Sequence, residues 1–188
     1  MTQGNKERRY IGRTDEPLCE EGKKQLMRLR DVLGSWDEKN LYLVSSPMKR
    51  CMETTKILFP KSVFRVCDHL RETDFGLFEG KNYEELKELR VYQQWIDSNG
   101  ALSIQGAEDH NLFVQRVVKA FLEEIHRMND LQLKKGAFII HGGCIMGILE
   151  KLSATKESFY HWQIGNGNGY IIQLDDSLVI QSIEPILS

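Results

Sequence analysis

The amino-acid sequence predicts an α/β fold of three layers, in which a mostly parallel sheet is flanked by helices. Strand-like and helix-like segments alternate along the chain, which is typical of parallel strands joined by crossover helices. The runs LYLVSS (41–46) and GAFIIHGG (136–143) are short and apolar, as expected of strands buried on both faces. The 188 residues suit one domain over 1–188, long enough to bury a sizeable core.

The first half of the chain predicts two helices and two strands. Leucines recur at helical spacing through residues 20–35 and predict a helix there: Leu26, Leu29 and Leu33. A second helix is expected after the strand at 41–46, with Ser46 suited as its N-cap and Pro47 as its first residue. The run SVFRVC (62–67) predicts the next strand.

The second half begins with a helix predicted over about 82–96. Asp109 is suited to cap a long helix, whose apolar residues recur at helical spacing: Phe113, Val117, Phe121 and Ile125. The buried strand at 136–143 leads into a short helix, CIMGILEKL. Residues 169–183 predict two strands joined across an Asp-Asp-Ser turn.

Composition narrows the function classes. The formal net charge is −2 and the pI about 6.2, so no basic surface for nucleic acid or membranes is indicated. No apolar run approaches a membrane span, and the polar N-terminus lacks the apolar centre of a signal peptide. The four cysteines form no C-x-x-C pair, which favours a reduced, cytoplasmic setting. The five histidines show no ligand spacing, so no metal site is expected.

Two polar clusters are predicted at the carboxyl ends of strands. Ser45 and Ser46 close one strand, and His141 followed by Gly142 closes another. Because parallel strands place their carboxyl ends on one rim, both clusters are expected to face the same crevice. Backbone amides at the Ser-Pro helix start could bind an anion, and Arg50, one turn later, could bind two oxygens of a phosphate.

Each of these residues also has an ordinary structural interpretation. Arg50 could be a solvated surface arginine, and His141 a core histidine bonded to a carbonyl. Glu72 follows a strand in the loop HLRETDFGLFEG, where partial burial would raise its pKa and make it a candidate general acid. From this stretch alone, an exposed loop glutamate is the favoured interpretation. Glu79 is a weaker candidate.

Five motifs in order make the chain resemble the histidine phosphatase superfamily, whose fold is phosphoglycerate mutase-like. They are TQGN, RYIGRTDEPL, SSPMKR, LRETDFGLFEG and HGG, and they span Thr2 to roughly Tyr170. The resemblance is closest to the alpha-ribazole phosphatase branch. It implies a phosphatase that needs no metal or cofactor, because arginine and histidine side chains stabilise the transferring phosphoryl group.

The resemblance also implies roles for particular residues. The catalytic set is Arg50 as a phosphate clamp, His141 as the second histidine and Glu72 as the acid that protonates the leaving oxygen. Ligand or phosphate contacts fall on four further positions: Thr2, Asn5, Arg9 and Gly142.

One family motif, R-H-G at the end of a first strand, would precede Met1. Its histidine is the family nucleophile, so 1–188 is expected to be an N-terminally truncated domain, inactive as it stands. In the family, the strand carrying R-H-G lies beside the strand that ends in H-G-G, here AFIIH. We therefore expect residues 137–141 to lack a partner strand on one side, unless another segment fills the slot.

The predicted function is hydrolysis of a small phosphorylated metabolite through a phosphohistidine intermediate. Alpha-ribazole 5'-phosphate and sugar phosphates are both open as substrates. Two alternatives stay open: a phosphotransferase of the phosphoglycerate mutase type, and a non-catalytic phospho-ligand binder. No nucleic acid or membrane partner is expected, and a homodimer is open.

Overall fold

A parallel three-stranded sheet, in the order β2-β1-β3, forms the centre of the computed structural model, which describes residues 1–33 and 40–186. Its strands are β1 (Leu41–Ser45), β2 (Arg65–Val66) and β3 (Lys135–Ile139). β1 and β3 pair along their whole lengths, from Leu41 opposite Lys135 to Ser45 opposite Ile139. Their carboxyl ends therefore meet at one rim, as the sequence predicts.

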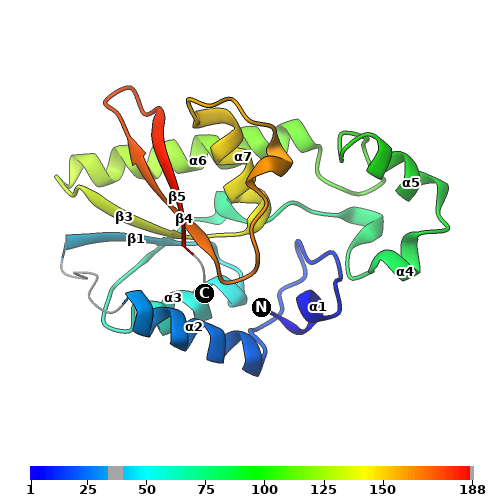
Figure 1. Ribbon diagram of the computed structural model, residues 1–188, viewed down its shortest axis with the longest axis horizontal. Helices are drawn as coiled ribbons and strands as arrows, with labels where there is room; N and C mark the ends of the chain where they lie inside the picture. The colour runs from blue at the N-terminus through cyan, green and yellow to red at the C-terminus, as the bar shows by residue number, and fades with distance from the viewer. Residues whose placement is uncertain (34–39, 187–188) are drawn as a thin grey trace.

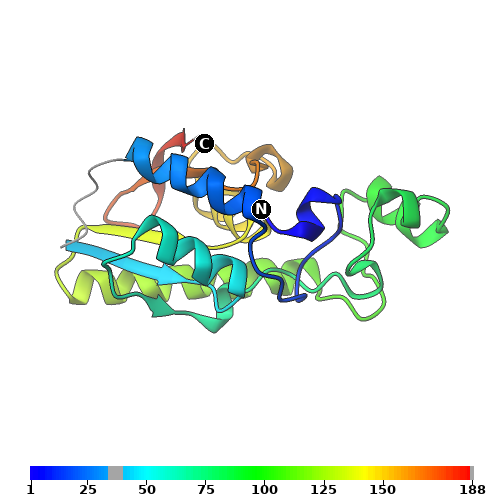
Figure 2. The ribbon, with the colours of Figure 1, turned by 90° about the horizontal axis from the view of Figure 1, so that it is seen from below.

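Helices cover both faces of this sheet (Figures 1 and 2). The helices α6 (His110–Asp130) and α7 (Gly142–Leu152) pack together on one face. The helices α2 (Glu20–Leu33) and α3 (Lys49–Leu58) pack together on the other. This is the three-layer α/β fold that the sequence predicts. The end of the helix expected over 20–35 lies outside the described residues.

The apolar stripe of α6 explains its position. Phe113, Val117, Phe121 and Ile125 are all buried, and they recur every four residues on the face toward the sheet. They form the main core together with residues of the sheet and of α7, including Val44, Cys144 and Ile148.

A separate antiparallel pair completes the strands: β4 (Gly169–Leu174) and β5 (Ile180–Ile186). This confirms the predicted hairpin at the carboxyl end of the chain. Short helices are α1 (Gln3–Lys6) and the 3-10 helices η2 (Asp68–Leu70), η3 (Gly76–Phe78) and η4 (Phe159–Trp162). None of the helices in the described ranges combines the length and apolar character that a membrane span requires.

The single helix expected over 82–96 is wrong, because two short helices stand there: α4 (Tyr83–Leu86) and α5 (Arg90–Asp97). Leu86 and Tyr92 are both buried in one aromatic cluster with Phe78. In a continuous helix, residues six apart would point about 120° away from each other. The break between α4 and α5, which lie to the right of the sheet in Figure 1, lets both side chains enter the same cluster.

Two further expectations change in the structure. The strand expected over 62–67 is reduced to Arg65–Val66, and Val63 is fully exposed. The strand expected to be buried at 136–143 is only partly buried, as β3 lies at an edge of the three-stranded sheet. The local sequence of both segments is that of an ordinary strand. The contacts with the rest of the fold therefore decide how long and how buried each strand is.

The predicted cap of the longest helix yields a stability test. The Asp109 carboxylate accepts hydrogen bonds from the amides of Asn111 (2.9 Å) and Leu112 (3.1 Å), at the start of α6. Asp109→Ala should lower the free energy of unfolding by about 1 kcal/mol, measured by urea denaturation. Asp109→Asn, which retains the acceptor, should keep most of it. Equal losses in both variants would show that the charge matters and the cap does not.

Candidate active site

A cavity of about 380 Å³ runs along β3, between that strand and β4, and reaches the rim where β3 ends at His141. Six of the seven predicted site residues line it: Thr2, Asn5, Arg50, Glu72, His141 and Gly142. The remaining one, Arg9, lies elsewhere, because its guanidinium binds the carboxylates of Glu7 and Glu85 and the carbonyl of Gly80. The crevice predicted from the two strand ends is therefore present, and the structure does not bring Arg9 into it.

Arg50 is held in the first turn of α3 as a nearly buried cation, 8% exposed. Its guanidinium donates to the carbonyls of Thr14 and Gly12, each at 2.8 Å, and its Nε donates to Nδ1 of His141 at 3.3 Å. No carboxylate of the described residues forms an ion pair with it. A buried charge is normally paired. The neutral partners of Arg50 therefore leave its charge available to an anion in the cavity.

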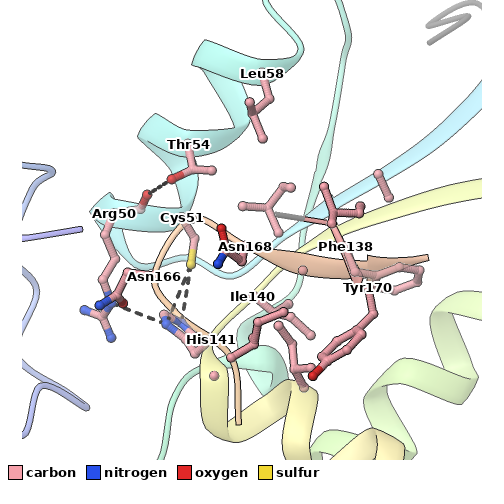
Figure 3. A pocket seen from close by; sticks show the side chains of 18 of the residues that line it. Arg50, Cys51, Thr54, Leu58, Phe138, Ile140, His141, Asn166, Asn168 and Tyr170 are labelled. Carbon is pink, nitrogen blue, oxygen red and sulfur yellow. Dashed lines mark hydrogen bonds between the residues drawn. The ribbon is translucent and has the colours of Figure 1, made fainter. Parts of the chain in front are cut away.

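His141 follows β3 and precedes α7, and its ring points toward Arg50 (Figure 3). The other ring nitrogen contacts the Ser46 hydroxyl. Since Arg50 Nε donates to Nδ1, that nitrogen accepts, and the ring proton belongs on Nε2. Nε2 is 2.7 Å from Ser46 Oγ and donates to it. Burial, and then the charges of Arg50 and Arg116, lower the pKa of His141 well below its usual range. The imidazole is therefore neutral at pH 7.

Glu72 reaches the cavity from the loop after η2. Its carboxylate accepts hydrogen bonds from the amides of Gly143 and Thr73, each at 3.0 Å. Gly143 must be glycine for this contact, because a Cβ there would lie 2.3 Å from Glu72 Oε1. Burial raises the pKa of Glu72, against the opposing effects of these amides and of Arg50 and Arg116. The direction is the one that a general acid requires.

Thr2 and Asn5 form a reciprocal cap on α1. The Thr2 hydroxyl accepts from the amide of Asn5, and the Asn5 side-chain oxygen accepts from the amide of Thr2. Thr2 is fully buried at the wall of the cavity, whereas Asn5 is partly exposed there. The cap thus fixes Asn5 at the cavity. Its side-chain oxygen is used in the cap, so its side-chain nitrogen is the group that can contact a ligand.

The helix start expected at Ser46 and Pro47 is wrong. The helix α3 begins at Lys49, and the Ser46 hydroxyl bonds to His141 instead of capping it. The amide of Lys49 donates to the Asp15 carboxylate at 2.7 Å. The Asp15 carboxylate therefore occupies the anion site that was predicted at this helix terminus. Arg50 is the anion-binding group that remains.

Sequence reasoning did not identify Ser46 and Cys51 individually as neighbours of His141. The Cys51 sulfur lies 3.6 Å from Nε2 and 3.7 Å from Nδ1 of the ring (Figure 3). Burial raises the pKa of Cys51 to about 12, so its thiol stays protonated at neutral pH. Cys51 directly follows Arg50 in the first turn of α3. Its position next to Arg50 in the sequence could have identified it as a neighbour of the site. In the described part of the chain, no group of acidic, cysteine or histidine side chains could hold a metal ion.

Glu79, the weaker candidate for a general acid, binds backbone amides of the loop that contacts Arg50. Its Oε1 accepts from the amides of Gly12 (2.8 Å) and Thr14 (2.9 Å), while its Oε2 accepts from the amide of Phe75 (3.3 Å). The carbonyls of Gly12 and Thr14 are the acceptors of the Arg50 guanidinium. Glu79 therefore fixes the loop that orients Arg50.

Glu79→Gln should weaken the binding of inorganic phosphate about tenfold, equivalent to about 1.4 kcal/mol. The amide nitrogen of glutamine cannot accept one of the three loop hydrogen bonds, so the carbonyls that hold Arg50 should shift. A ³¹P NMR titration measures the affinity. Glu84→Gln is the matched control, since Glu84 pairs only with the exposed Lys87 in the structure. Unchanged affinity in a folded Glu79→Gln variant would contradict this role.

The titration of His141 gives a second test. Long-range ¹H–¹⁵N NMR should give a pKa below 6.5, and Arg50→Gln should raise it only part of the way, because burial is the larger cause. Below about pH 6.5 the unfolded chain takes up a proton at His141 while the folded chain does not, so acid lowers the free energy of unfolding. A pKa above 6.5 would contradict the assigned geometry.

Comparisons with known proteins agree with this architecture. The family model of the histidine phosphatase superfamily (branch 1) matches residues 1–180. Phosphoserine phosphatase 1 of Hydrogenobacter thermophilus is 32% identical over 123 residues, 63% of this chain. That stretch covers only 57% of the relative, so the chain spans little more than half of that protein's length.

Solved structures extend the likeness to the whole fold. Alpha-ribazole phosphatase from Shigella flexneri superposes with a TM-score of 0.79 at 19% identity, covering 100% of this chain and 90% of that one. Phosphoglycerate mutase from Thermus thermophilus gives 0.70 at 26% identity, covering 97% and 92%. The first of these likenesses shows the fold alone. Together with a family model that matches nearly the whole sequence, they show that this chain belongs to the histidine phosphatase superfamily.

Proposed function

We propose that this domain binds the phosphoryl group of a small phosphomonoester and, when joined to a nucleophilic histidine, hydrolyses it. The observation that carries the proposal is the buried Arg50 cation, whose described partners are three carbonyls, those of Ile11, Gly12 and Thr14, and a neutral imidazole. A phosphate oxygen is the kind of partner that such a cation lacks. His141 and Glu72 line the same cavity and supply the other groups that phosphoryl transfer needs.

In the proposed first step, an imidazole nitrogen of the added histidine attacks phosphorus and forms an N–P bond. The bond between phosphorus and the ester oxygen breaks, and the leaving oxygen takes a proton from Glu72. The raised pKa of Glu72 favours the protonated form that gives up this proton. Arg50 stabilises the charge that develops on the equatorial oxygens, and the Nε2–H of His141 does so once it exchanges the Ser46 hydroxyl for a phosphoryl oxygen.

In the second step, water attacks the phosphohistidine. Glu72, now ionised, accepts the proton of the attacking water, and the N–P bond breaks to release inorganic phosphate and restore the imidazole. No redox partner or metal is needed for this balance. The residues of this chain thus provide the clamp and the acid, and the nucleophile is the component to be added.

The substrate class is a small phosphorylated metabolite. Membership of the histidine phosphatase superfamily and the similarity to phosphatases of small metabolites support this class. Alpha-ribazole 5'-phosphate and phosphoserine are candidates through the similar proteins named above, as are sugar phosphates. A transferase of the mutase type would differ in its product, because it would pass the phosphoryl group to a second hydroxyl instead of water.

A second candidate, a non-catalytic phospho-ligand binder, has its own supporting observation. The pKa of the Cys51 thiol is raised to about 12, and the Ser46 hydroxyl already accepts a hydrogen bond from His141. Neither is an activated nucleophile at neutral pH. The 188 residues as they stand therefore fit a phosphate-binding site better than a complete catalytic one.

The test compares the chain with a version extended before Met1 by a strand ending in Arg-His-Gly. The unextended chain should hydrolyse 4-nitrophenyl phosphate scarcely above background, whereas the extended chain should turn over. In the extended chain, Arg50→Ala and His141→Ala should each lower kcat at least ~10²–10³-fold, since each removes a stabiliser of the transferring charge.

The matched control carries Arg-Gln-Gly in place of Arg-His-Gly. It should bind phosphate without turning over. If the unextended chain proves robustly active, the nucleophile lies within residues 1–188 and the two-step route is wrong. If the extended chain binds phosphate but stays inactive, the non-catalytic binder is favoured.

A further inference from the structure

An ion pair outside the cavity lining reaches the loop that carries Glu72. Arg116 lies in the second turn of α6, and Glu108 directly precedes the Asp109 cap of that helix. Arg116 Nε donates to Oε1 of Glu108 at 2.8 Å, and its Nη2 donates to Oε2 at 2.7 Å. Both side chains are only 23% exposed. A bidentate contact of this kind fixes the geometry of both side chains, unlike an ordinary surface ion pair.

The same two residues hold the backbone of that loop. Nη1 of Arg116 donates to the carbonyl of His69 at 2.7 Å and to that of Arg71 at 3.2 Å. The amide of Glu108 donates to the carbonyl of Asp74 at 3.0 Å. The pair therefore fastens the chain immediately before the candidate acid and again shortly after it.

An aromatic ring links the guanidinium to the turn that meets the acid. The Cζ atom of Arg116 lies 5.3 Å from the centroid of the Phe113 ring, one turn earlier in α6. The same ring contacts the turn that follows His141, since a Cβ on Gly143 would lie 3.2 Å from Phe113 Cζ. The amide of Gly143 donates to the Glu72 carboxylate. Arg116 is thus packed in one unit with the turn that Glu72 contacts.

Two of the groups around the Glu72 carboxyl are charged. The titratable and charged groups around it are Arg50 and Cys51 of α3, Arg116 of α6, Cys144 of α7, and His141 of the same cavity. Burial raises the pKa of both thiols and lowers that of the imidazole, so all three are neutral. Burial also raises the pKa of Glu72. Two backbone amides oppose that rise most, followed by the charges of Arg50 and Arg116.

We propose that Arg116 and Glu108 are positioning residues for Glu72. Through two carbonyls and one amide they hold the loop so that the Glu72 carboxyl meets the amide of Gly143, and Arg116 keeps a positive charge near that carboxyl. Without this charge, burial would make the carboxyl hold its proton more tightly, whereas a general acid has to release its proton and take it back. Glu108 neutralises part of the charge and so limits its effect.

The test measures the pKa of Glu72 in the 188-residue chain. Glutamate side-chain carboxyls are labelled with ¹³C and titrated by NMR, and the signal that Glu72→Gln lacks is assigned to Glu72. Arg116→Gln removes both the bidentate contact and the charge, whereas Arg116→Lys removes the bidentate contact and retains the charge. The pKa of Glu72 should be at least ~0.5 higher in Arg116→Gln than in Arg116→Lys, since only the former lacks the nearby positive charge.

The hold on the loop has a separate measurement in the same samples. Amide hydrogen exchange at Thr73 and Gly143 should become at least ~10-fold faster in both Arg116 variants, because neither retains all the contacts that hold the loop. Arg71→Gln is the matched control. It removes an arginine next to Glu72 in the sequence, but this side chain is 53% exposed and pairs with an exposed aspartate. It should leave the pKa and the exchange rates close to those of the unchanged chain, since solvent and salt screen its charge.

Equal pKa values of Glu72 in the two Arg116 variants, or unchanged exchange at Thr73 and Gly143, would overturn the proposal. A purely structural role would lower the pKa equally in both variants, because a loosened loop exposes the carboxyl. If Arg116→Gln does not fold, Glu108→Gln decides. Releasing Arg116 from its counter-ion should lower the pKa of Glu72, and an unchanged value would overturn the proposal.

The inference rests on the proposed role of Glu72 as the acid, but the two fail separately. None of the NMR measurements needs turnover. An inactive extended chain would therefore defeat the proposed reaction, whereas equal pKa values in the two Arg116 variants would defeat the positioning role alone.

Discussion

The site depends on how one buried cation is held. The carbonyls of Gly12 and Thr14 orient the Arg50 guanidinium, and Glu79 holds the amides of the same two residues. Glu79 therefore positions Arg50 through the loop and forms no ion pair with it. A carboxylate in direct contact would have neutralised the cation. This arrangement fixes the geometry of the guanidinium and leaves its charge for a ligand.

The two titratable groups beside Arg50 respond to it in a consistent way. A positive neighbour disfavours protonation of His141, so the imidazole remains neutral and keeps its single ring proton on Nε2. The same positive charge opposes the protonation of Glu72, but burial is the larger effect and the pKa of Glu72 is raised. Burial therefore acts in opposite senses on the two groups, because in each it disfavours the charged form. Burial therefore favours the neutral form of both groups in one cavity.

Much of this could be predicted from the sequence, where the signal was local. The Asp109 cap, the apolar stripe of α6 and the hairpin of β4 and β5 follow from side-chain period and turn chemistry within each segment. The convergence of Arg50 and His141 follows from the rule that parallel strands share a rim. Predictions that depended on distant contacts did less well. Ser46 has the chemistry of an N-cap, but its hydroxyl meets His141, 95 residues away. The break between α4 and α5 depends on an aromatic cluster assembled from several loops.

The β3 strand shows where local pattern and tertiary setting diverge. Its apolar run predicts a strand with two neighbours, and among the described residues it has one, β1. An apolar sequence is typical of a strand that is buried among neighbours. At the edge of a sheet, such a strand exposes backbone groups that favour pairing with another chain. The contacts that hold Glu72, Arg50 and His141 come from α3, from α7 and from the loop that Glu79 fixes. None of these contacts comes from the outer edge of β3. The phosphate-binding groups are thus organised by contacts that do not involve the outer edge of β3.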